Sequence, residues 1–578
     1  MSKLNIDQQT IFQLFSDKKS DFIIPDYQRP YAWGDDECLT LWDDIFSFAF
    51  PSDDYTCFDQ ENDEYFLGPI VTFRNESNKL EIIDGQQRLT TLMLLLRAFY
   101  KRFENMKDSN SMTTRQNIAK CIWKTDEFGN LRIDCLKIDS EVVSDDDKNE
   151  FLEILKTGES KNYYKSQYSK VFKLFLNKIE DFIKDYPSYC AYLPARIMNN
   201  CILLPIEAES QDTALRIFST LNDRGKPLSD SDIFKAQFYK YYSDKNEKDI
   251  FIKKWKDLEN LTEKIFSSKA YSSMDELFTR YMYYERAKKG IKSTTTDSLR
   301  KFYEQGKYEL LKRDETFNNL NTLANFWKMI YEQDADNFSF DVLKKLFVLK
   351  YAPNGMWAYI LSVYFMKNKD DNGKLNNDEL LKFLTRITAF IYAYYFTNPG
   401  VNALRTPLYP EMVKIVKGDC IGIDAYKFDR DELKRKIYDF SFVNKKIITK
   451  SILIWYMMED FDQDLIDYDV DLEIEHICSK NRYENDKDFL DNKLIDSLGN
   501  KALLEKKINV RASDYRFEDK KKYYLGQKDK NKQATKNHEL RLMAENRIDF
   551  TKEDIENRKE KIINSFIKFV ESNNLIKE

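Results

Sequence analysis

Apolar residues at the spacing of one helix face fill the chain from about residue 205 to residue 460, with few prolines or glycines between them. Phenylalanine, tyrosine and leucine take the inward positions, which indicates a packed core rather than a platform for stacked bases. This stretch predicts a helical middle between two parts that carry strand patterns. The candidate helices are Thr213–Leu221, Asp230–Tyr242, Asp341–Tyr351, Trp357–Lys367 and Asn377–Phe396.

A chain of 578 residues exceeds what one hydrophobic core supports, so several domains are expected. The patterns predict a multidomain α+β protein divided into residues 1–240, 241–445 and 446–578. Charged residues make up 33% of the chain, which favours folded domains with a well-solvated surface over disorder.

The N-terminus has no apolar core of signal-peptide length, and the most apolar later stretch, Leu380–Phe396, is interrupted by Lys382 and Arg386. The eight cysteines are scattered without a CxxC pair, which argues for reduced thiols and against zinc. A cytoplasmic protein without a membrane partner is therefore expected. The net charge of −6 does not by itself indicate a nucleic-acid binder.

Strand and helix patterns alternate before the helical stretch. Two strand-like runs are joined by a predicted hairpin turn at Asn75–Asn78, and an apolar helix buried on all sides follows them. Residues 138–168 are polar and charged, and a long loop or solvated insertion is expected there. The other expected elements are an extended run at Phe22–Trp33, a helix near Asp36–Phe50, strands at Tyr65–Arg74 and Lys79–Asp84, a buried helix at Leu89–Tyr100 and a helix near 171–183.

The segment Asp84-Gly85-Gln86-Gln87-Arg88 lies between a predicted strand and the buried helix. Glycine permits a tight turn, the helix N-terminus offers free N–H groups, and Arg88 can hold a phosphate with two hydrogen bonds. The segment therefore predicts an anion site. The alternative is that it only caps the helix, with Asp84 paired to Arg88. No GxxxxGK[ST] sequence occurs, so a nucleotide site here is not a P-loop.

His476, one of two histidines in the chain, directly follows a β-like run that carries Glu473 and Glu475. An imidazole serves as a base near neutral pH, and a carboxylate with an amide oxygen suits a hard cation such as Mg²⁺. Phosphodiester hydrolysis needs these groups together. The other histidine, His538, lies in a polar stretch and is interpreted as a solvated bystander.

A local excess of basic residues follows His476. Between Lys501 and Lys536 there are twelve lysines and arginines against five acidic residues. Such a patch can contact phosphates, although a solvated helix face has the same composition. The predicted DNA contacts are Lys506, Lys507, Arg511, Lys520 and Lys521.

The C-terminal segments EHICSK, SLGNKALL and KKINVRAS resemble the ββα-metal (His-Me finger) pattern of HNH nucleases, and more closely the nuclease domain of GmrSD-type restriction enzymes. The resemblance implies that Glu475 and Asn509 bind the metal and that His476 is the general base. It also implies that Asn500 holds the histidine or its loop. Where the family usually has proline, this chain has Ser479.

Four N-terminal segments, IPDYQRPYAW, FLGPIV, DGQQRLTT and FSTLNDRGKPLSDSDIFKA (Phe218–Ala236), resemble the GmrSD N-terminal domain, which has a ParB/sulfiredoxin-like fold. The resemblance implies that this region binds and hydrolyses a nucleoside triphosphate. Asn222, Arg224 and Lys226 either extend the pocket or shape a turn. The implied nucleotide-binding residues are Tyr27, Gln28, Arg29, Asp84, Gly85, Gln86, Gln87 and Arg88.

The resemblance to the GmrSD family implies a type IV, modification-dependent endonuclease of bacterial anti-phage defence that acts on double-stranded, modified phage DNA. Mg²⁺ or Mn²⁺ is the expected metal, and the sequence does not distinguish GTP, UTP, CTP and ATP as the nucleotide. The alternatives are an NTP-gated DNA-binding or scaffold protein with an inactive nuclease fold, and an indiscriminate abortive-infection nuclease. The sequence leaves open the DNA modification, nicking against double-strand cutting, and whether the chain forms a homodimer.

Overall fold

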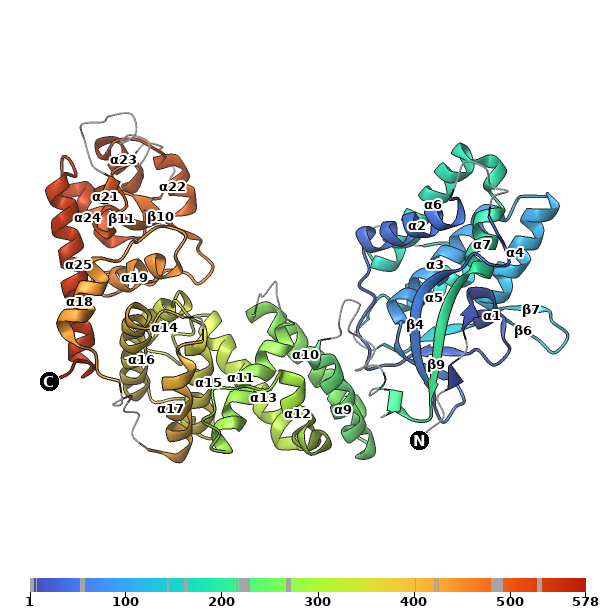
Figure 1. The fold of residues 1–578 in the computed structure, drawn as a ribbon, viewed down its shortest axis with the longest axis horizontal. Helices are drawn as coiled ribbons and strands as arrows, with labels where there is room; N and C mark the ends of the chain where they lie inside the picture. The colour runs from blue at the N-terminus through green and yellow to red at the C-terminus, as the bar shows by residue number, and fades with distance from the viewer. Residues whose placement is uncertain are drawn as a thin grey trace. The chain divides into compact units, whose positions relative to one another are not determined.

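The computed structural model describes two compact units, Met1–Lys256 and Asp257–Glu578 (Figure 1). The predicted multidomain α+β class is confirmed. The helical middle and the C-terminal part share one unit, and the division into three domains stays a prediction. Every helix among the described residues is too short or too polar to cross a bilayer. The description leaves out residues 1–4, 7, 52–57, 143–144, 161–164, 212, 215–216, 218–228, 267–271, 401, 420–422, 424–425, 480–491 and 528–532.

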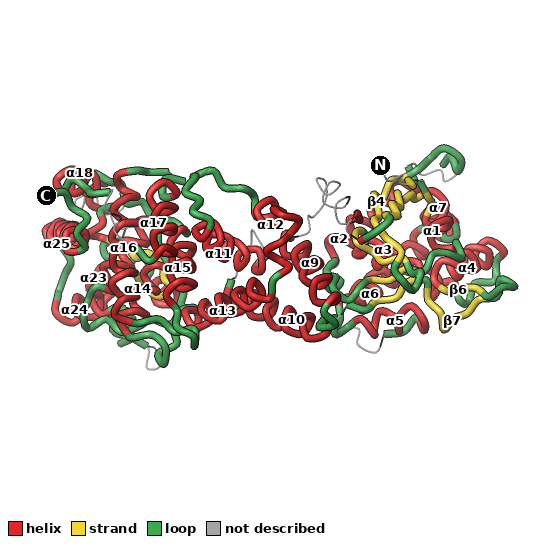
Figure 2. Tube along the Cα trace, turned by 90° about the horizontal axis from the view of Figure 1, so that it is seen from below, coloured by secondary structure: helices red, strands yellow, loops and turns green. Residues whose placement is uncertain are grey.

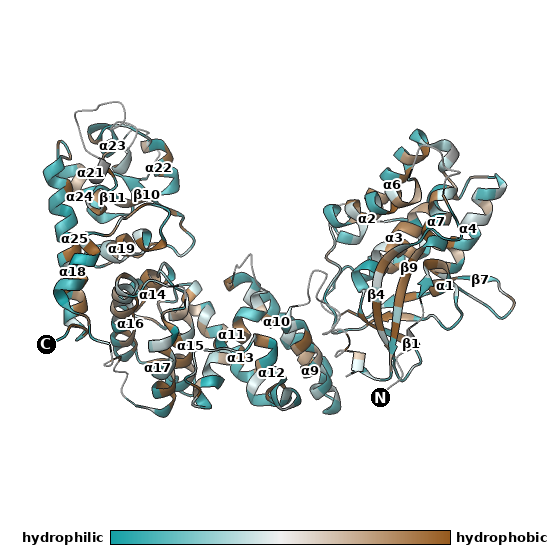
Figure 3. Cartoon of the chain, viewed as in Figure 1, coloured by the Kyte–Doolittle hydropathy of each residue, from teal (hydrophilic) through white to brown (hydrophobic). Residues whose placement is uncertain are grey.

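A mixed sheet forms the centre of the first unit, in the order β1-β9-β4-β5-β3-β8, with β2 beside β9. The predicted hairpin is confirmed, because β4 and β5 pair antiparallel around Asn75–Asn78. Apolar residues run along β4 and β9, which pair in parallel (Figure 3). The strands are β1 Asn5–Ile6, β2 Gln9–Thr10, β3 Phe22–Ile24, β4 Tyr65–Arg74, β5 Leu80–Asp84, β8 Ile138–Ser140 and β9 Cys201–Ala208.

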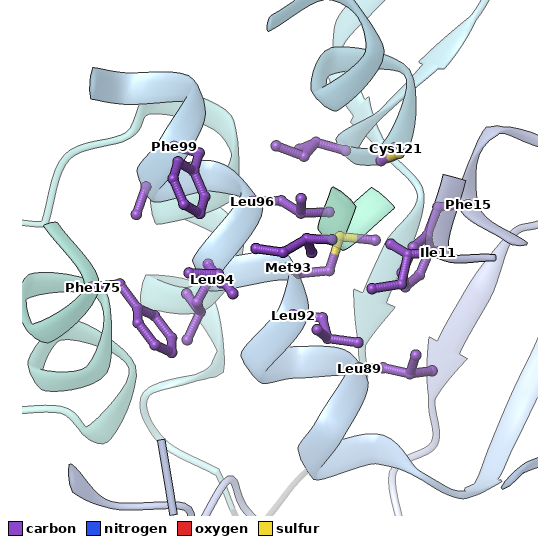
Figure 4. Close-up of a cluster of buried hydrophobic side chains, with 14 of the residues drawn as sticks. Ile11, Phe15, Leu89, Leu92, Met93, Leu94, Leu96, Phe99, Cys121 and Phe175 are labelled. Atoms are coloured by element: carbon purple, nitrogen blue, oxygen red, sulfur yellow. The ribbon is translucent and has the colours of Figure 1, made fainter. Parts of the chain in front are cut away.

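The central helix of the first unit, α3 (Gln86–Phe103), is buried on all sides, as predicted. Its apolar side chains meet those of several other helices in one core, in which Leu92 and Met93 are fully buried (Figure 4). The other elements are α1 Ile11–Ser16, α2 Asp35–Ala49, α4 Ser109–Ile122, β6 Trp123–Thr125, β7 Leu131–Leu136, α5 Lys148–Thr157, α6 Gln167–Asp185, α7 Tyr192–Asn200, α9 Asp230–Asp244 and α10 Lys248–Ile265.

The expected loop at residues 138–168 is wrong for much of its length. The chain forms β8 there, and then the amphipathic helix α5, which buries Phe151, Ile154 and Leu155. Glu153 and Lys156 are exposed on α5 while its three apolar residues face the core, and the charged composition of the segment did not reveal this short apolar stripe.

Helices dominate the second unit (Figure 2). The predicted helices are confirmed except Thr213–Leu221, which lies largely outside the described residues. The helices are α11 Ser273–Lys288, α12 Leu299–Tyr308, α13 Asp314–Tyr331, α14 Phe340–Lys350, α15 Met356–Asn368, α16 Asn377–Thr397, α17 Arg405–Lys417, α18 Arg430–Tyr438, α19 Ile447–Met458, α21 Asn492–Ile495, α22 Lys506–Ala512, α23 Phe517–Tyr524, α24 His538–Asn546 and α25 Lys552–Ser572.

A two-stranded antiparallel hairpin lies among the C-terminal helices of this unit. It consists of β10 (Leu472–His476) and β11 (Lys501–Glu505), and the 3-10 turn Leu498–Asn500 leads into β11. This turn packs against the backbone of α25, and a Cβ atom on Gly499 would lie 1.9 Å from the carbonyl oxygen of Ile555. Close approach of the two backbones therefore requires glycine at this position.

We expect Gly499→Ala to lower the free energy of unfolding of the second unit by about 3 kcal/mol, because the added methyl group forces α25 away from the turn. Gly355→Ala is the matched control, since a Cβ atom at Gly355 meets nothing within 4 Å. Urea denaturation of both variants measures the difference. Equal stabilities would contradict the close packing of the turn against α25.

Candidate functional site

The β10–β11 hairpin divides the predicted site residues between its two faces. Successive side chains of a strand point to opposite sides, so Glu473 and Glu475 share one face and His476 lies on the other. The strand pairing places Lys501 directly opposite His476. The side chains that surround the imidazole of His476 therefore differ from those that surround the two carboxylates.

On the histidine face, the imidazole lies beside a carboxylate. His476 Nε2 is 3.5 Å from Asp496 Oδ1, and Lys501 Nζ is 3.1 Å from the same oxygen. Lys501 is fully buried and also donates to Asn444 Oδ1 at 2.8 Å. The sequence interpretation missed Asp496 and Lys501, which fix the charge next to the imidazole.

This environment keeps His476 neutral. Burial and then the charge of Lys501 lower the pKa of His476 to about 4, although Asp496 opposes the shift. Partial burial raises the pKa of Asp496, but the hydrogen bond and charge of Lys501 and the neighbouring His476 hold it below its usual value. At neutral pH the imidazole is therefore unprotonated beside a carboxylate, as a general base requires.

On the other face, Glu475 is buried and paired. Its side chain is 5% exposed, and its Oε1 accepts from Lys520 Nζ at 2.7 Å and from the Tyr524 hydroxyl at 2.6 Å. Burial raises the pKa of Glu475, and the charge of Lys520 counteracts this rise. Lys520 also donates to the backbone carbonyl oxygen of His476 at 2.6 Å.

Asn509, on α22, meets a different glutamate from the one expected. Its Nδ2 donates to Glu473 Oε2 at 2.9 Å, and Lys506 Nζ lies 3.8 Å from Glu473 Oε1. Among the described residues, the side chains of His476, Glu475 and Asn509 have different partners: Asp496, Lys520 with Tyr524, and Glu473. The structure thus brings Asn509 to Glu473, and it places Glu475 with Lys520.

The two glutamates differ in how well they fit a divalent cation. A cation on Glu475 would lie close to the ammonium of Lys520 in a buried site, where like charges repel strongly, so Glu475 does not fit as a ligand. Glu473 and Asn509 are half-buried and in contact, and a flip of the Asn509 amide, which now turns its Nδ2 to Glu473, would offer a carboxylate and an amide oxygen, the donors that Mg²⁺ prefers. The pair that fits is therefore Glu473 with Asn509.

Asn500 is fully buried and holds the turn that follows His476. Its Oδ1 accepts from the backbone N–H of Cys478 at 2.7 Å, and its Nδ2 donates to the carbonyl oxygens of Cys478 and Ile495 at 3.0 and 2.9 Å. Its hydrogen bonds go to the backbone of the loop and not to the imidazole. Of the two implied roles, the geometry favours holding the loop.

The predicted DNA contacts divide into surface and buried residues. Lys506 and Lys507 are exposed on α22, while Arg511 and Lys521 are half-buried. Lys520 is 1% exposed and points inward, so its predicted contact with DNA is wrong. Its spacing from Phe517 and Tyr524, also buried, puts it on the inner face of α23.

His538 is paired and not a solvated bystander. Its Nδ1 lies 2.7 Å from Asp460 Oδ2, and Asp462 completes a group whose possible ligand atoms lie within 4.8 Å of one another. The backbone N–H of Asp462 donates to Asp460 Oδ1 at 3.1 Å, so Asp462 and His538 between them already use both oxygens of Asp460.

In the first unit, the predicted turn between strand and helix forms at Gly85, the N-cap of α3. Gly85 has φ +92°, in the left-handed region that favours glycine, and its N–H donates to Asp84 Oδ1 at 2.7 Å. The backbone N–H groups that begin α3 are therefore presented at the end of β5.

Three glutamines tie this turn to the loop that follows β3. Two of them lie in the first turn of α3 and one lies in the loop, and all are buried. Their amide groups donate to backbone carbonyl oxygens, which supports the anchoring role. The bonds are Gln86 Nε2 to Arg29 O (3.1 Å), Gln87 Nε2 to Pro30 O (3.1 Å) and Gln28 Nε2 to Ile83 O (3.1 Å).

Two guanidinium groups face one carboxylate here. Arg88 donates to Pro69 O at 3.0 Å and packs against Gly68. Burial raises the pKa of Asp84, although the N–H of Gly85 and the charges of Arg88 and Arg29 oppose this. Arg29 Nε is buried and has no hydrogen-bond partner in the described part of the chain.

The remaining predicted residues lie elsewhere or are not described. The hydroxyl of Tyr27 lies 3.5 Å from Glu81 Oε2, and its ring packs against Tyr239. Asn222, Arg224 and Lys226 lie outside the described residues. An anion site here would therefore use Arg29, the first N–H groups of α3 and the guanidinium nitrogens of Arg88 other than the Nη1 that binds Pro69.

Comparison with protein families gives two matches. A model described as the N-terminal domain of the GmrSD restriction endonuclease matches residues 11–239, and one for the C-terminal domain of these enzymes matches residues 427–565. Together the two matches span more than half of the chain and contain the turn at Gly85 and the β10–β11 hairpin. No curated protein matches the chain.

The two asparagines of the hairpin region should respond differently to truncation. Asn500→Ala leaves buried backbone groups of the loop without partners, and we expect it to lower the free energy of unfolding by about 2–3 kcal/mol. Asn509→Ala should change it by no more than about 0.5 kcal/mol, because Asn509 reaches solvent. Urea denaturation measures both, and a larger loss for Asn509→Ala would contradict these roles.

Proposed function

The chain belongs to the GmrSD family of restriction endonucleases, enzymes of phage defence that act on DNA, and we propose that it is a divalent-metal-dependent endonuclease regulated by a nucleoside triphosphate. The observation that carries the chemistry is the neutral imidazole of His476 beside the carboxylate of Asp496. An HNH-type reaction needs such a base.

In the proposed reaction, His476 accepts a proton from a water molecule whose oxygen forms a bond to phosphorus while the bond to the departing 3′ oxygen breaks. The imidazole gains a positive charge in this step, and Asp496 stabilises it from 3.5 Å. Asn500 keeps the loop after the histidine in place. A divalent cation held by Glu473 and Asn509 would stabilise the negative charge on the departing 3′ oxygen, which takes the electron pair of the broken bond.

We propose that the substrate is double-stranded DNA, in particular modified phage DNA. Lys506, Lys507, Arg511 and Lys521 give the surface of α22 and α23 cationic groups that can contact phosphates. Binding through such contacts weakens as the salt concentration rises.

We propose that the turn at Gly85 binds the phosphates of the nucleotide. The N-terminus of α3 carries a partial positive charge, and Arg29 and Arg88 add two guanidinium groups. The unpartnered Nε of Arg29 supports this role, because a buried donor without an acceptor fits a site that a ligand completes.

An inactive nuclease fold remains a second candidate function. The pairing of Glu475 with Lys520, together with Ser479 where the family usually has proline, supports it. In that case the chain binds DNA under nucleotide control without cutting it, and metal-dependent nicking of plasmid DNA by the purified chain decides between the two.

His476→Ala should abolish nicking of plasmid DNA, with a loss of at least about 100-fold, because no other described group replaces the base. His538→Ala is the control and should cut like the unaltered chain. Circular dichroism checks that both variants are folded. Unchanged cutting by His476→Ala would contradict the assignment of the base.

Arg29→Met should weaken binding of nucleoside triphosphates by at least about tenfold, because it removes a guanidinium group while the Arg29 backbone carbonyl still anchors Gln86. Arg132→Met, on the exposed strand β7, is the control. Fluorescent triphosphate analogues measure both affinities. Equal affinities for the two variants would place the nucleotide elsewhere.

A further inference from the structure

We propose that Lys520, with Glu475 as its counter-charge, is a positioning residue for His476. The expected effect on catalysis rests on the proposed nuclease function. The positioning itself follows from the ammonium of Lys520, which donates to Glu475 Oε1 at 2.7 Å and to the backbone carbonyl oxygen of His476 at 2.6 Å.

The burial of this group makes its position specific. The side chains of Lys520 and Glu475 are 1% and 5% exposed, and charges removed from water are tolerated only when they are paired and hydrogen-bonded. An ammonium group that leaves this place gives up two acceptors at once. Lys520 is therefore held in one arrangement, and it holds both partners in turn.

The carbonyl group that Lys520 holds belongs to the residue that carries the imidazole. On the following side, the N–H of Ile477 donates to the carbonyl oxygen of Asn500 at 2.9 Å, and the Asn500 side chain binds Cys478. The backbone on both sides of the His476 peptide unit is thus fixed. Because His476 ends β10, this fixation sets the direction in which its imidazole leaves the strand.

The same contacts argue that Glu475 is not a metal ligand. Its Oε1 already accepts from Lys520 and Tyr524, and both donors are buried. A cation on Oε1 would have to displace the ammonium of Lys520, and a cation on the other oxygen would lie beside that ammonium in a buried site, where the two positive charges repel. Glu475 therefore balances the charge of Lys520, and its removal should leave metal binding intact.

The chain contains two histidines, so a spectrum of ¹³C-labelled histidine contains two side-chain signals, one of which belongs to His476. His538→Gln assigns the two signals. We expect Lys520→Met to shift or broaden the His476 signal, because the donor to its carbonyl is lost. Tyr524→Phe is the matched control: it removes one hydrogen bond from Glu475 and leaves the bond to His476, so the signal should stay in place. Equal responses in the two variants would overturn the positioning role.

Lys520→Met leaves the buried carboxylate of Glu475 without its counter-charge, which could unfold this region. A second variant tests whether unfolding alone explains the result. The double variant Glu475→Gln with Lys520→Met removes both charges, and it should be more stable than Lys520→Met and still show the displaced His476 signal. A His476 signal restored to its original position in the double variant would mean that Lys520 acts only through stability.

Two further measurements separate this inference from the proposed function. Glu475→Gln should bind Mn²⁺ with an affinity within about twofold of that of the unaltered chain, measured by electron paramagnetic resonance. Loss of binding would make Glu475 a ligand.

In plasmid nicking, Lys520→Met should lower kcat about tenfold or more with an unchanged KM for DNA, and Tyr524→Phe should leave kcat unchanged. An unaltered chain that fails to nick would refute the nuclease proposal, while the histidine signals and Mn²⁺ binding would still decide the role of Lys520.

Discussion

The alternation of side chains along one short strand, Leu472–His476, determines what the C-terminal part can do. It sends the imidazole toward Asp496 and Lys501 and sends both glutamates toward α22 and α23. A phosphate that uses both His476 and the oxygen atoms of Glu473 must approach along an edge of the hairpin or past its end. Glu475 and His476 are therefore neighbours in the sequence, but their side chains do not line the same pocket.

The buried pair of Lys520 and Glu475 fixes the position of the backbone at His476 more than it stabilises the fold. Removing two charges from water is unfavourable, and their attraction compensates only when further hydrogen bonds satisfy both groups. Tyr524 and the carbonyl oxygen of His476 supply these bonds. An apolar pair of similar size would fill the space equally well, but it would not hold the carbonyl at the end of β10.

Local patterns predicted the elements well, and contacts distant in the sequence account for most of the errors. The hairpin around Asn75–Asn78, the buried helix α3 and the turn at Gly85 follow from alternation, apolar content and glycine. The partner of Asn509 could not be read in the same way, because Glu473 and Glu475 precede it at almost equal distance and only the packing of α22 chooses between them. His538 likewise finds Asp460 across 78 positions. The burial of Lys520 was predictable, since its spacing from Phe517 and Tyr524 marks the inner face of a helix.

The central claim is that Glu473 with Asn509, and not Glu475, provides the oxygen atoms for a cation, while Lys520 stays on Glu475. Anomalous scattering from a crystal of the chain soaked in Mn²⁺ tests it most directly. The account predicts a manganese peak beside Glu473 and Asn509, with the ammonium of Lys520 still bound to Glu475 and to the carbonyl oxygen of His476. A peak on the carboxylate of Glu475, with Lys520 displaced, would contradict it.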